Sequence, residues 1–354
     1  MAYIGLLVGM ICSFLLCNLR DWKLCFNRNK KIYMILFSFC CILLMGLRSD
    51  AVGYDTATYK NYFTIVEYTP IKVILGNFYF QSMEIGFALL MKICSCISSS
   101  YFFFQFIVSA VYCSGMALFI YRNSQNCIFA SFIFLGIGLF LTAFNVQRQM
   151  LAVMLVVNSW GYFASKQYIK MLLLLTLAIT VHTASIIFII AYVIYLFRQY
   201  RIVYLFFVVG IVISIFYYDK VIDLAIQYLP IYNNYYSNTK EILSVGFVKV
   251  LWGIIIALSL AILIKGNKEI ISLRVYAVFS ILYVVSNIIG LEFNYFERLG
   301  WFFLPFVVLL FDGFGSIFHN LVIKTIYYGG VLLSFIFYFI LSTQSEQYIY
   351  SIWF

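Results

Sequence analysis

The sequence has little charge, few prolines and almost no histidine. Its 354 residues include 23 Lys and Arg, 13 Asp and Glu, 3 Pro and 2 His, whereas 65% of them are hydrophobic. Soluble domains carry about a quarter charged residues, so this scarcity excludes a soluble globular protein and favours a chain embedded in a bilayer. The apolar runs are long and continuous, while the strands of a membrane barrel alternate, so we expect spanning helices.

Several sequence signatures are also missing. There is no P-loop, no Gly-rich dinucleotide loop, no His-Glu-x-x-His and no paired metal-ligand spacing. The nine cysteines all precede residue 128 and form no Cys-x-x-Cys pair, so we interpret them as small core residues. An enzyme with this sequence would therefore use an activated, lipid-borne substrate without ATP, and we expect no cofactor and no metal ion.

The net charge of +10 does not indicate nucleic acid, because the basic residues form small clusters between apolar runs, as cytoplasmic loops do. The expected cytoplasmic clusters are 20–31, 121–122, 165–170, 198–201 and 265–274, together with Lys324. Basic residues follow the first apolar run instead of preceding it, which argues against a cleaved signal peptide.

These clusters predict twelve membrane-spanning helices with both termini on the outer side. The expected spans are 2–19, 32–47, 101–120, 127–144, 150–163, 170–181, 183–197, 202–217, 246–264, 275–291, 299–318 and 325–342. The run 85–97 is too short to span and contains Lys92, so we expect a re-entrant or interfacial helix. The chain is then one integral membrane domain, 1–354, with outer segments 48–100 and 218–245. The second is rich in Tyr and Asn, which suits either sugar binding or a membrane interface.

Three arginines fall at the outer mouths of spans: Arg48, Arg148 and Arg298. A guanidinium grips phosphate with two parallel hydrogen bonds and keeps its charge at any relevant pH. Each arginine alone could equally be an interfacial anchor or the partner of a nearby acid such as Glu297. Three on one side, among few outer cations, favour a shared anionic ligand.

His182 lies at an outer turn between two apolar runs. Since imidazole titrates near neutral pH, its functional interpretation is a base, or a hydrogen-bond donor to a leaving group. A structural turn residue is the alternative, and the sequence leaves both open. His319 lies beside a cytoplasmic loop, and we interpret it as incidental.

Asp55 opens an expected surface helix that runs through Val66 and ends at Pro70. It can cap that helix, contact substrate, or do both. Gly53 suits a tight turn that brings backbone amides near whatever Arg48 holds. The helix repeats its apolar residues at helical spacing, so we expect that face to lie on the bilayer: Tyr59, Tyr62, Phe63 and Val66.

Four stretches resemble one family in the same order along the chain. "RSDAVGYDTATYKNYF" is similar to the R…VG-x-D-T…Y…F signature of the EpsG family of polysaccharide-assembly membrane proteins. "FNVQRQMLA" resembles its N-x-x-RQ-x-x-A stretch, "LAITVHTASIIF" its His segment and "FERLGWFF" its later E-R element. The resemblance covers about residues 30 to 310. The family often has Thr where this chain has Tyr54.

The resemblance implies an all-α polytopic fold related to type C glycosyltransferases, with a Wzy-type polymerase activity. It implies transfer of a growing glycan from undecaprenyl diphosphate to a hydroxyl of a new lipid-linked repeat unit. The chain would build O-antigen, capsule or exopolysaccharide at the outer face of the cytoplasmic membrane. Its expected partners are these lipid-linked oligosaccharides and the bilayer, with room for a chain-length regulator protein.

The same resemblance suggests roles for single residues. We expect Arg48, Arg148 and Arg298 to bind the diphosphates, and His182 or Asp55 to deprotonate or orient the acceptor hydroxyl. The other expected contacts to glycan or lipid are Tyr59, Gln147, Gln149 and Glu297. Two alternatives remain: an O-antigen ligase or other lipid-sugar glycosyltransferase, and a lipid-linked oligosaccharide flippase. A flippase needs charges along the membrane centre, where only Asp312 falls.

Overall fold

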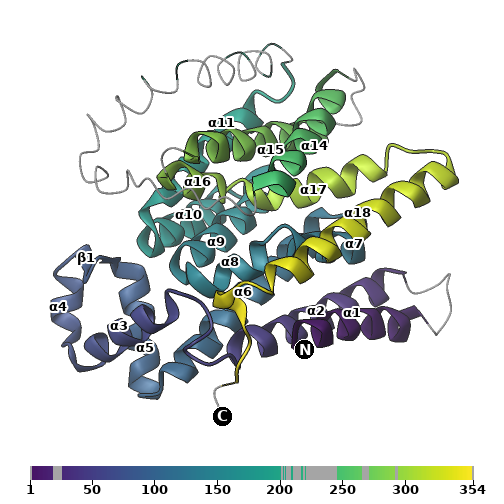
Figure 1. Ribbon diagram of the computed structural model, residues 1–354. Coiled ribbons are helices and arrows are strands. Elements are labelled where there is room, and N and C mark those ends of the chain that lie inside the picture. Colours follow the sequence, from purple (N-terminus) through teal and green to yellow (C-terminus); the bar gives the residue numbers. More distant parts are fainter. Residues whose placement is uncertain are drawn as a thin grey trace. The chain divides into compact units, whose positions relative to one another are not determined.

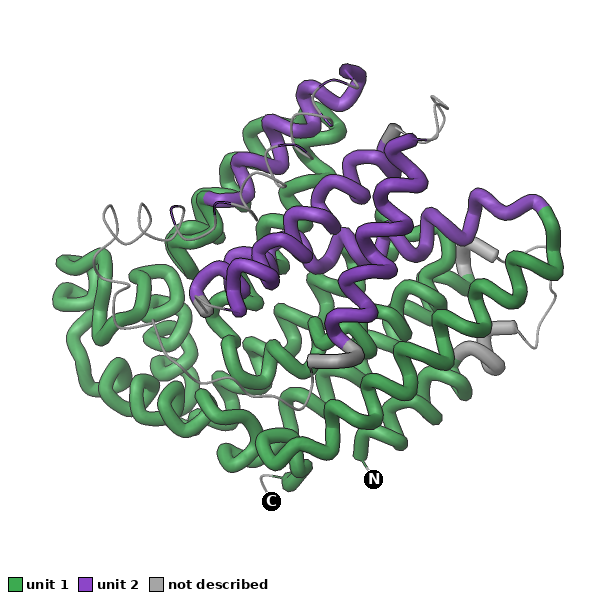
Figure 2. Tube along the Cα trace, turned by 45° about the horizontal axis from the view of Figure 1, so that its top comes forward, with its two compact units in different colours: residues 1–186, 320–354 green, residues 187–319 purple. Residues whose placement is uncertain are grey.

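The computed structural model describes residues 2–18, 26–200, 202, 204, 209, 217, 220, 245–264, 271–291 and 294–352. In this part of the chain, nearly all regular structure is helical (Figure 1). The chain divides into two compact units (Figure 2). Unit 1 comprises Met1–Ile186 and Asn320–Phe354, and unit 2 comprises Ile187–His319.

Unit 1 is built on long apolar helices that pack side by side. Its pairs are α1 with α2, α2 with α6, α6 with α9, α9 with α10, and α7 with α18. Asn126 and Asn320 begin α7 and α18 by accepting backbone N–H groups with their side chains. The bounds are α1 Ala2–Asn18, α2 Phe26–Gly46, α6 Tyr101–Asn123, α7 Cys127–Gly136, α8 Leu139–Asn145, α9 Gln147–Ala164, α10 Tyr168–Val181 and α18 Leu321–Ser342.

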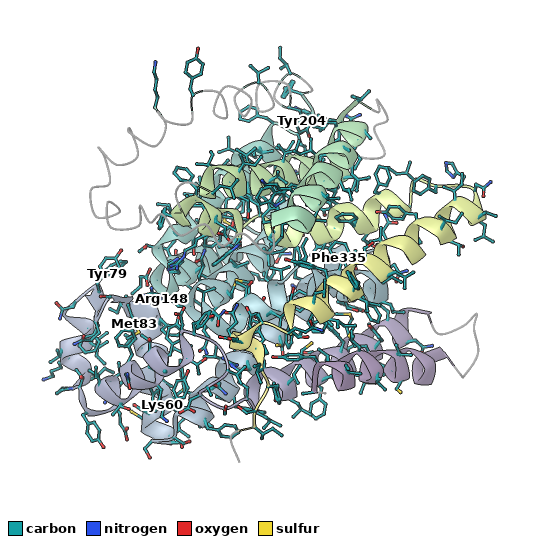
Figure 3. All side chains as sticks on the ribbon, viewed as in Figure 1. Lys60, Tyr79, Met83, Arg148, Tyr204 and Phe335 are labelled. Atoms are coloured by element: carbon teal, nitrogen blue, oxygen red, sulfur yellow. The ribbon has the colours of Figure 1, made fainter. Side chains whose placement is uncertain are left out.

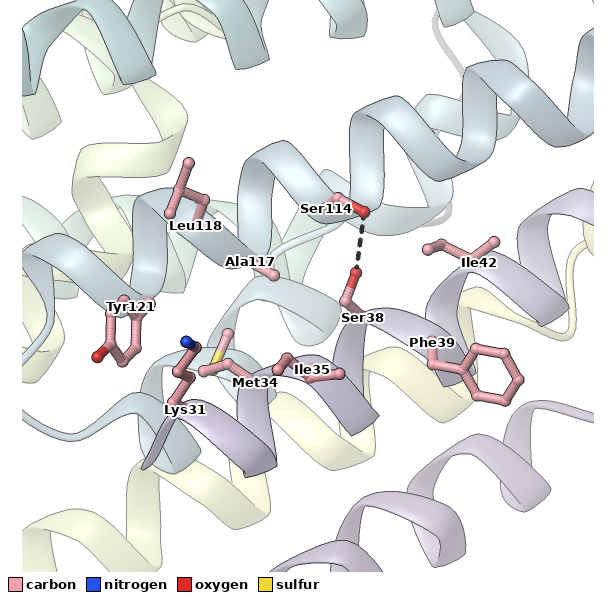
Figure 4. Close-up of a pocket in the computed structure, with 10 residues that line it drawn as sticks. All are labelled: Lys31, Met34, Ile35, Ser38, Phe39, Ile42, Ser114, Ala117, Leu118 and Tyr121. Carbon is pink, nitrogen blue, oxygen red and sulfur yellow. Dashed lines mark hydrogen bonds between the residues drawn. The ribbon is translucent and has the colours of Figure 1, made fainter. Parts of the chain in front are cut away.

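A groove runs along the packed pair α2 and α6 (Figure 4). Ser38 and Ser114 meet across it at 3.4 Å. Ile35, Phe39 and Leu118 line it and are 57%, 55% and 40% exposed. Such an exposed apolar lining suits contact with lipid chains, because in water it would be unfavourable.

The expected span 127–144 is bent. Gly138 has a φ of +93°, which an L side chain rarely adopts, and α7 and α8 meet there at 45°. A second corner follows at Val146, which has non-helical dihedral angles between α8 and α9. The chain therefore changes direction twice before Arg148, which lies in the first turn of α9.

Residues 48–100, the expected outer segment, fold into short helices and a hairpin. Its elements are α3 Thr56–Tyr68, α4 Ile71–Leu75, β1 Tyr79–Phe80, β2 Met83–Glu84 and α5 Ile85–Ile97. The buried residues of α3 include Tyr59 and Phe63, whose rings pack on Phe87 of α5 and Phe104 of α6. The apolar face of α3 therefore packs against protein, which corrects the expectation that it lies on the bilayer. Lys92 of α5 donates to the α3 carbonyl of Glu67 at 2.8 Å, where the helix dipole is negative.

Several basic side chains lie together at one end of unit 1. Lys30 donates to the Ser124 carbonyl at 3.1 Å, while Arg122 and Lys170 lie over the Tyr162 ring at 5.8 and 5.6 Å. Tyr162 and Arg148 lie at opposite ends of α9. Members of three expected cytoplasmic clusters thus gather at the end away from Arg148, as the predicted threading requires.

Unit 2 is also helical. Its core includes the rings of Phe188, Phe279, Phe303 and Phe306, and the ring centres of Phe279 and Phe306 lie 4.8 Å apart. The expected span 299–318 is divided, because α16 ends at Gly300 and α17 starts with Pro305 in its first turn. The bounds are η1 Thr183–Phe188, which begins in unit 1, α11 Ile189–Leu196, α14 Val245–Ile264, α15 Ile271–Gly290, α16 Asn294–Gly300 and α17 Leu304–Gly315.

The helices confirm an all-α membrane protein. Four helices of the described chain are each long and apolar enough to cross a bilayer, and the bent pair α7 and α8 makes a fifth. They are Asn29–Gly46, Tyr101–Asn123, Ser272–Gly290 and Leu321–Ser342. The expected span 202–217 and outer segment 218–245 lie outside the described residues, apart from single positions. The seven described cysteines are all free, and Cys12 and Cys96 are exposed instead of lying in the core.

Candidate functional site

An acid, a histidine and an arginine from three distant parts of unit 1 meet at one point. The Oε1 atom of Glu84 lies 2.9 Å from Nδ1 of His182, and its Oε2 atom lies 2.8 Å from Nη1 of Arg148. Thr183 also donates its N–H and its hydroxyl to Oε1, at 3.0 and 3.2 Å. One carboxylate thus joins the start of α5, the end of α10 and the start of α9.

Close packing of α5 on α10 brings Glu84 to His182. A Cβ atom on Gly86 would lie 2.7 Å from the backbone of Thr180, so this contact requires glycine. Glu84 is the N-cap residue of α5 and His182 the C-cap residue of α10. The positive end of one helix therefore faces the carboxylate, and the negative end of the other faces the imidazole, and both arrangements are favourable.

A strained turn completes the arrangement. Gln81 and Ser82 connect β1 to β2 with φ values of +50° and +63°, although neither is glycine. The Ser82 carbonyl accepts a hydrogen bond from Nη1 of Arg148 at 2.7 Å. Figure 3 shows Arg148 beside Met83, the residue that joins this turn to Glu84. Strain of this kind is common where a structure holds a functional group in place.

The surroundings of Glu84 keep it ionised. Burial raises the pKa of its carboxyl group, but the hydrogen bond from His182 and the charge of Arg148 outweigh burial, so the pKa is lowered to about 2. An ionised carboxylate only accepts hydrogen bonds, so Nδ1 of His182 carries the proton that it shares with Glu84. In the neutral ring, Nε2 is then the basic nitrogen.

The group is partly open. The Glu84 side chain is 4% exposed, whereas those of Arg148 and His182 are 23% and 17% exposed. Arg148 makes both of its described contacts through Nη1. The arrangement can therefore accept a proton at His182, hold the resulting imidazolium against Glu84, and present a guanidinium to an anion.

Arg48 does not fit its expected role. Its side chain is fully buried, and its guanidinium donates to the carbonyls of Met45, Val52 and Phe144 and lies 4.6 Å from the centre of the Phe144 ring. Burial lowers the pKa of Arg48 to about 10, which leaves it charged at neutral pH. Its donors are directed at the main chain, so here it secures a turn instead of presenting a charge to a diphosphate.

The other expected residues of unit 1 face inward or cap a helix. Gln147 and Gln149 are 1% and 4% exposed, and Tyr59 is 7% exposed against Phe87, so none presents its side chain to a surface-bound glycan in this conformation. Asp55 occupies the N-cap position of α3 as predicted, but its side chain makes no capping hydrogen bond. None of the expected site residues lines the groove between α2 and α6.

The remaining expected residues belong to unit 2. Arg298 is exposed on α16, and Glu297 beside it is half-buried. Burial raises the pKa of Glu297, and the charge of Arg298 acts in the opposite direction. The side chain of Arg298 is thus more exposed than that of Arg48. His319 is exposed between α17 and α18.

Glu84 is not among the site residues that the sequence predicts, and it lies without a recognisable motif in the expected outer segment 48–100. One local signal did exist, since Glu84 directly precedes the apolar run 85–97 and so stands at the start of an expected helix. Its pairing with His182 spans 98 positions, and nothing local to either residue indicates it.

The comparisons agree with the resemblance found in the sequence. A family model described as EpsG family matches residues 31–353, farther towards the C-terminus than the four motifs extend. No curated protein and no solved structure matches the chain. Because the match covers nearly the whole sequence, the chain belongs to the EpsG family, a family of Wzy-like polymerases.

Proposed function

We propose that this protein is a polymerase that joins polyprenyl-diphosphate-linked oligosaccharide repeat units into O-antigen, capsule or exopolysaccharide. The observation that carries this proposal is the Glu84–His182 pair beside Arg148 in a chain of the EpsG family. A base and a fixed cation are the two groups that this glycosyl transfer needs. The reaction requires no ATP, because the diphosphate ester already activates the sugar.

His182 is the base in this mechanism. Its Nε2 nitrogen takes the proton from the acceptor hydroxyl as the hydroxyl oxygen forms a bond to the anomeric carbon of the growing glycan. Glu84 holds the ring through Nδ1 and stabilises the imidazolium that forms, as the carboxylate of a catalytic triad does. Asp55 is the alternative base.

Arg148 stabilises the leaving group. As the bond between the anomeric carbon and the diphosphate oxygen breaks, the electron pair moves onto the diphosphate, and a fixed positive charge there lowers the barrier. The start of α9 adds backbone N–H groups on the same side. Glu84 partly neutralises Arg148, so a second cation is needed to hold a diphosphate, and the exposed Arg298 remains our proposal for it.

The threading completes the proposal. With the twelve spans that the sequence predicts, the Glu84–His182–Arg148 group would lie on the outer face of the cytoplasmic membrane, opposite the basic end of unit 1. The lipid-linked repeat unit then reacts where the glycan is assembled. A relation to type C glycosyltransferases would suit this arrangement of helices around an outer site.

Deletion of the gene tests this function. We expect electrophoresis of the surface glycan to show loss of the length ladder while a single repeat unit is retained, and the intact gene should restore the ladder. Loss of every surface repeat would instead indicate a ligase or a flippase and would overturn the proposal.

Variants test the site. We expect Arg148→Ala and His182→Ala to abolish the ladder with normal amounts of protein in the membrane. The matched controls are Arg122→Ala, an arginine at the opposite end of unit 1, and His319→Ala, the other histidine. Both controls should give wild-type ladders. A wild-type ladder from the His182 variant would remove it from the mechanism, and Asp55→Asn would then be the next base to test.

A further inference from the structure

The corner between α8 and α9 receives hydrogen bonds from the 48–56 turn, by which we mean residues 48 to 56. Arg48 Nη2 and Thr56 Oγ1 reach the Phe144 carbonyl at 3.2 and 3.5 Å. The backbone N–H of Tyr54 donates to Oδ1 of Asn145 at 2.9 Å. The segment with the family-like R…VG-x-D-T pattern therefore docks onto the corner that precedes Arg148.

A second segment holds the same turn from the far end of the chain. We call residues 345–352 the C-terminal strap. Its Gln347 carbonyl accepts the Gly53 N–H at 2.9 Å, and its Ser351 carbonyl accepts the Ser49 N–H at 2.8 Å. Arg48 and Ile352 form an antiparallel backbone bridge. The strap thus pairs with the turn over several residues.

Asn145 links both segments through one amide. Its Oδ1 accepts from Tyr54, and its Nδ2 donates to Gln347 Oε1 at 2.7 Å and to the Tyr348 hydroxyl at 3.2 Å. These contacts cross 91, 202 and 203 positions of sequence. An amide is well suited here, because it offers an acceptor and two donors within one short side chain.

The corner needs such support. Val146 leaves the helical region, with φ of −92° and ψ of +57°, so the hydrogen bonds of α8 do not continue regularly into α9. The direction of α9, and with it the position of Arg148, therefore depends on contacts from outside the two helices. Asn145, three residues before Arg148, makes three of these contacts with its side chain.

We propose that Asn145 is a positioning residue, which with the 48–56 turn and the C-terminal strap holds the start of α9 so that Arg148 meets Glu84 and the leaving group. This inference rests on the proposed function. It gives the R…VG-x-D-T segment a structural role, since Arg48, Gly53 and Thr56 all make contacts that hold the start of α9. It also makes residues 345–352 a requirement for efficient transfer. We call the contacts among the 48–56 turn, Asn145 and the C-terminal strap the clamp.

The first test compares Asn145→Leu with Asn145→Asp in purified protein. The probe is lipid-linked repeat unit extracted from cells that lack the gene. Leucine removes all three hydrogen bonds, and we expect kcat to fall about 100-fold, the effect of a shift of about 1 Å at a reacting group, with KM changed far less. Aspartate keeps the acceptor for Tyr54, and the Gln347 amide and the Tyr348 hydroxyl can turn to donate to it, so we expect activity within about threefold of wild type.

Three outcomes of this test are distinct. Wild-type kcat in Asn145→Leu would overturn the positioning role. An equal loss in both variants would overturn the hydrogen-bond argument. Absence of polymerisation by the wild-type protein would instead refute the proposed function itself.

The second test joins the C-terminal strap to the 48–56 turn with a disulfide bond. Ser49 and Ser351 have hydroxyl oxygens 2.5 Å apart, so Ser49→Cys with Ser351→Cys should form a disulfide on mild oxidation. We expect the cross-linked protein to polymerise as the reduced protein does, because the clamp is static. The single variants control for the natural cysteines. Failure to cross-link, or loss of activity that reduction restores, would contradict a static clamp.

Discussion

Nδ1 of His182 lies 2.9 Å from Oε1 of Glu84, and Glu84 in turn contacts Arg148 through its other carboxylate oxygen. This relationship assigns different roles to three groups. The carboxylate is buried and ionised, the imidazole is held in one tautomer, and the guanidinium stays partly exposed. It adds a buried carboxylate partner for His182 and Arg148 that the separate sequence motifs did not indicate.

Replacing Glu84 with Gln should nearly abolish polymerisation. The amide keeps the size of the side chain but removes the charge that stabilises an imidazolium, and loss of that charge in carboxylate–histidine pairs costs about 10⁴-fold in kcat. The measurement is the turnover of purified protein with lipid-linked repeat unit. Glu67→Gln is the matched control, because the contact of Glu67 with Lys92 uses its backbone carbonyl, which the substitution retains, and it should keep wild-type turnover.

The pH dependence of stability should reveal the contribution of the ionised Glu84 carboxylate. Its pKa is about 2 in the folded protein and near its ordinary value of 4.5 when unfolded, so its ionised form stabilises the fold above about pH 4.5. That contribution is lost as the pH falls from about 4.5 towards 2. Thermal unfolding of detergent-purified protein should therefore show a midpoint difference between wild type and Glu84→Gln that persists down to about pH 5 and narrows below about pH 4.5. Narrowing that begins near pH 7 would contradict the lowered pKa.

Arg48 should behave as a structural residue. Arg48→Ala leaves the carbonyls of Met45, Val52 and Phe144 without their buried donor, and each such group costs about 1–3 kcal/mol. We expect less protein in the membrane and a lower unfolding midpoint. Arg148→Ala removes one partner of Glu84, which keeps its contacts with His182 and Thr183, so it should abolish activity with a smaller fall of the midpoint than Arg48→Ala causes. Equal stability of the two variants would restore Arg48 as a candidate for binding diphosphate.

Gly53 should not tolerate a side chain. Its φ is +95°, and a Cβ atom there would lie 2.8 Å from the Phe144 carbonyl oxygen and 2.9 Å from Oδ1 of Asn145. Gly53→Ala should lower the free energy of unfolding by about 1–2 kcal/mol or more, since strain and a clash add. Gly161→Ala is the matched control, because nothing lies within 4 Å of its added methyl in α9, and it should stabilise by up to about 1 kcal/mol. Unfolding midpoints of the two proteins decide this prediction.

The strained turn between β1 and β2 can be relaxed. Gln81→Asn with Ser82→Gly supplies the pair that favours positive φ at both positions of a two-residue hairpin loop. We expect a gain of about 1 kcal/mol in the free energy of unfolding, measured from the thermal midpoint, because each non-glycine residue at positive φ costs about this much. The Ser82 carbonyl is retained, so Arg148 keeps its contact. A loss of stability would show that the two side chains contribute more than the strain costs.

Much of the fold follows from local sequence features. The four described helices that are long and apolar enough to cross a bilayer lie at the expected spans 32–47, 101–120, 275–291 and 325–342, because every backbone group inside a bilayer must be hydrogen-bonded within its own segment. The start of α3 after Asp55 and its end before Pro70 also follow from local rules. The bends at Gly138 and Val146 do not, since their causes are single backbone conformations inside an apolar run.

The candidate site could be predicted only in part. His182 and Arg148 stand out because charged and titratable residues are scarce in this chain. Arg48 stands out for the same reason, yet it faces carbonyls instead of a carboxylate. From its sequence, the amphipathic face of α3 resembles one that binds a membrane surface. In the structure, Phe87 and Phe104 cover it. A local pattern cannot distinguish lipid from another apolar helix.

The sequence by itself determined the membrane class, the family and the short set of residues able to carry chemistry. Only the tertiary structure decided that Glu84 joins His182 and Arg148, that Arg48 holds a turn, and that residues 345–352 bind that same turn. Hydropathy, capping and motif spacing act over a few residues. Contacts that cross 98 or 202 positions arise only when packed helices bring their ends together.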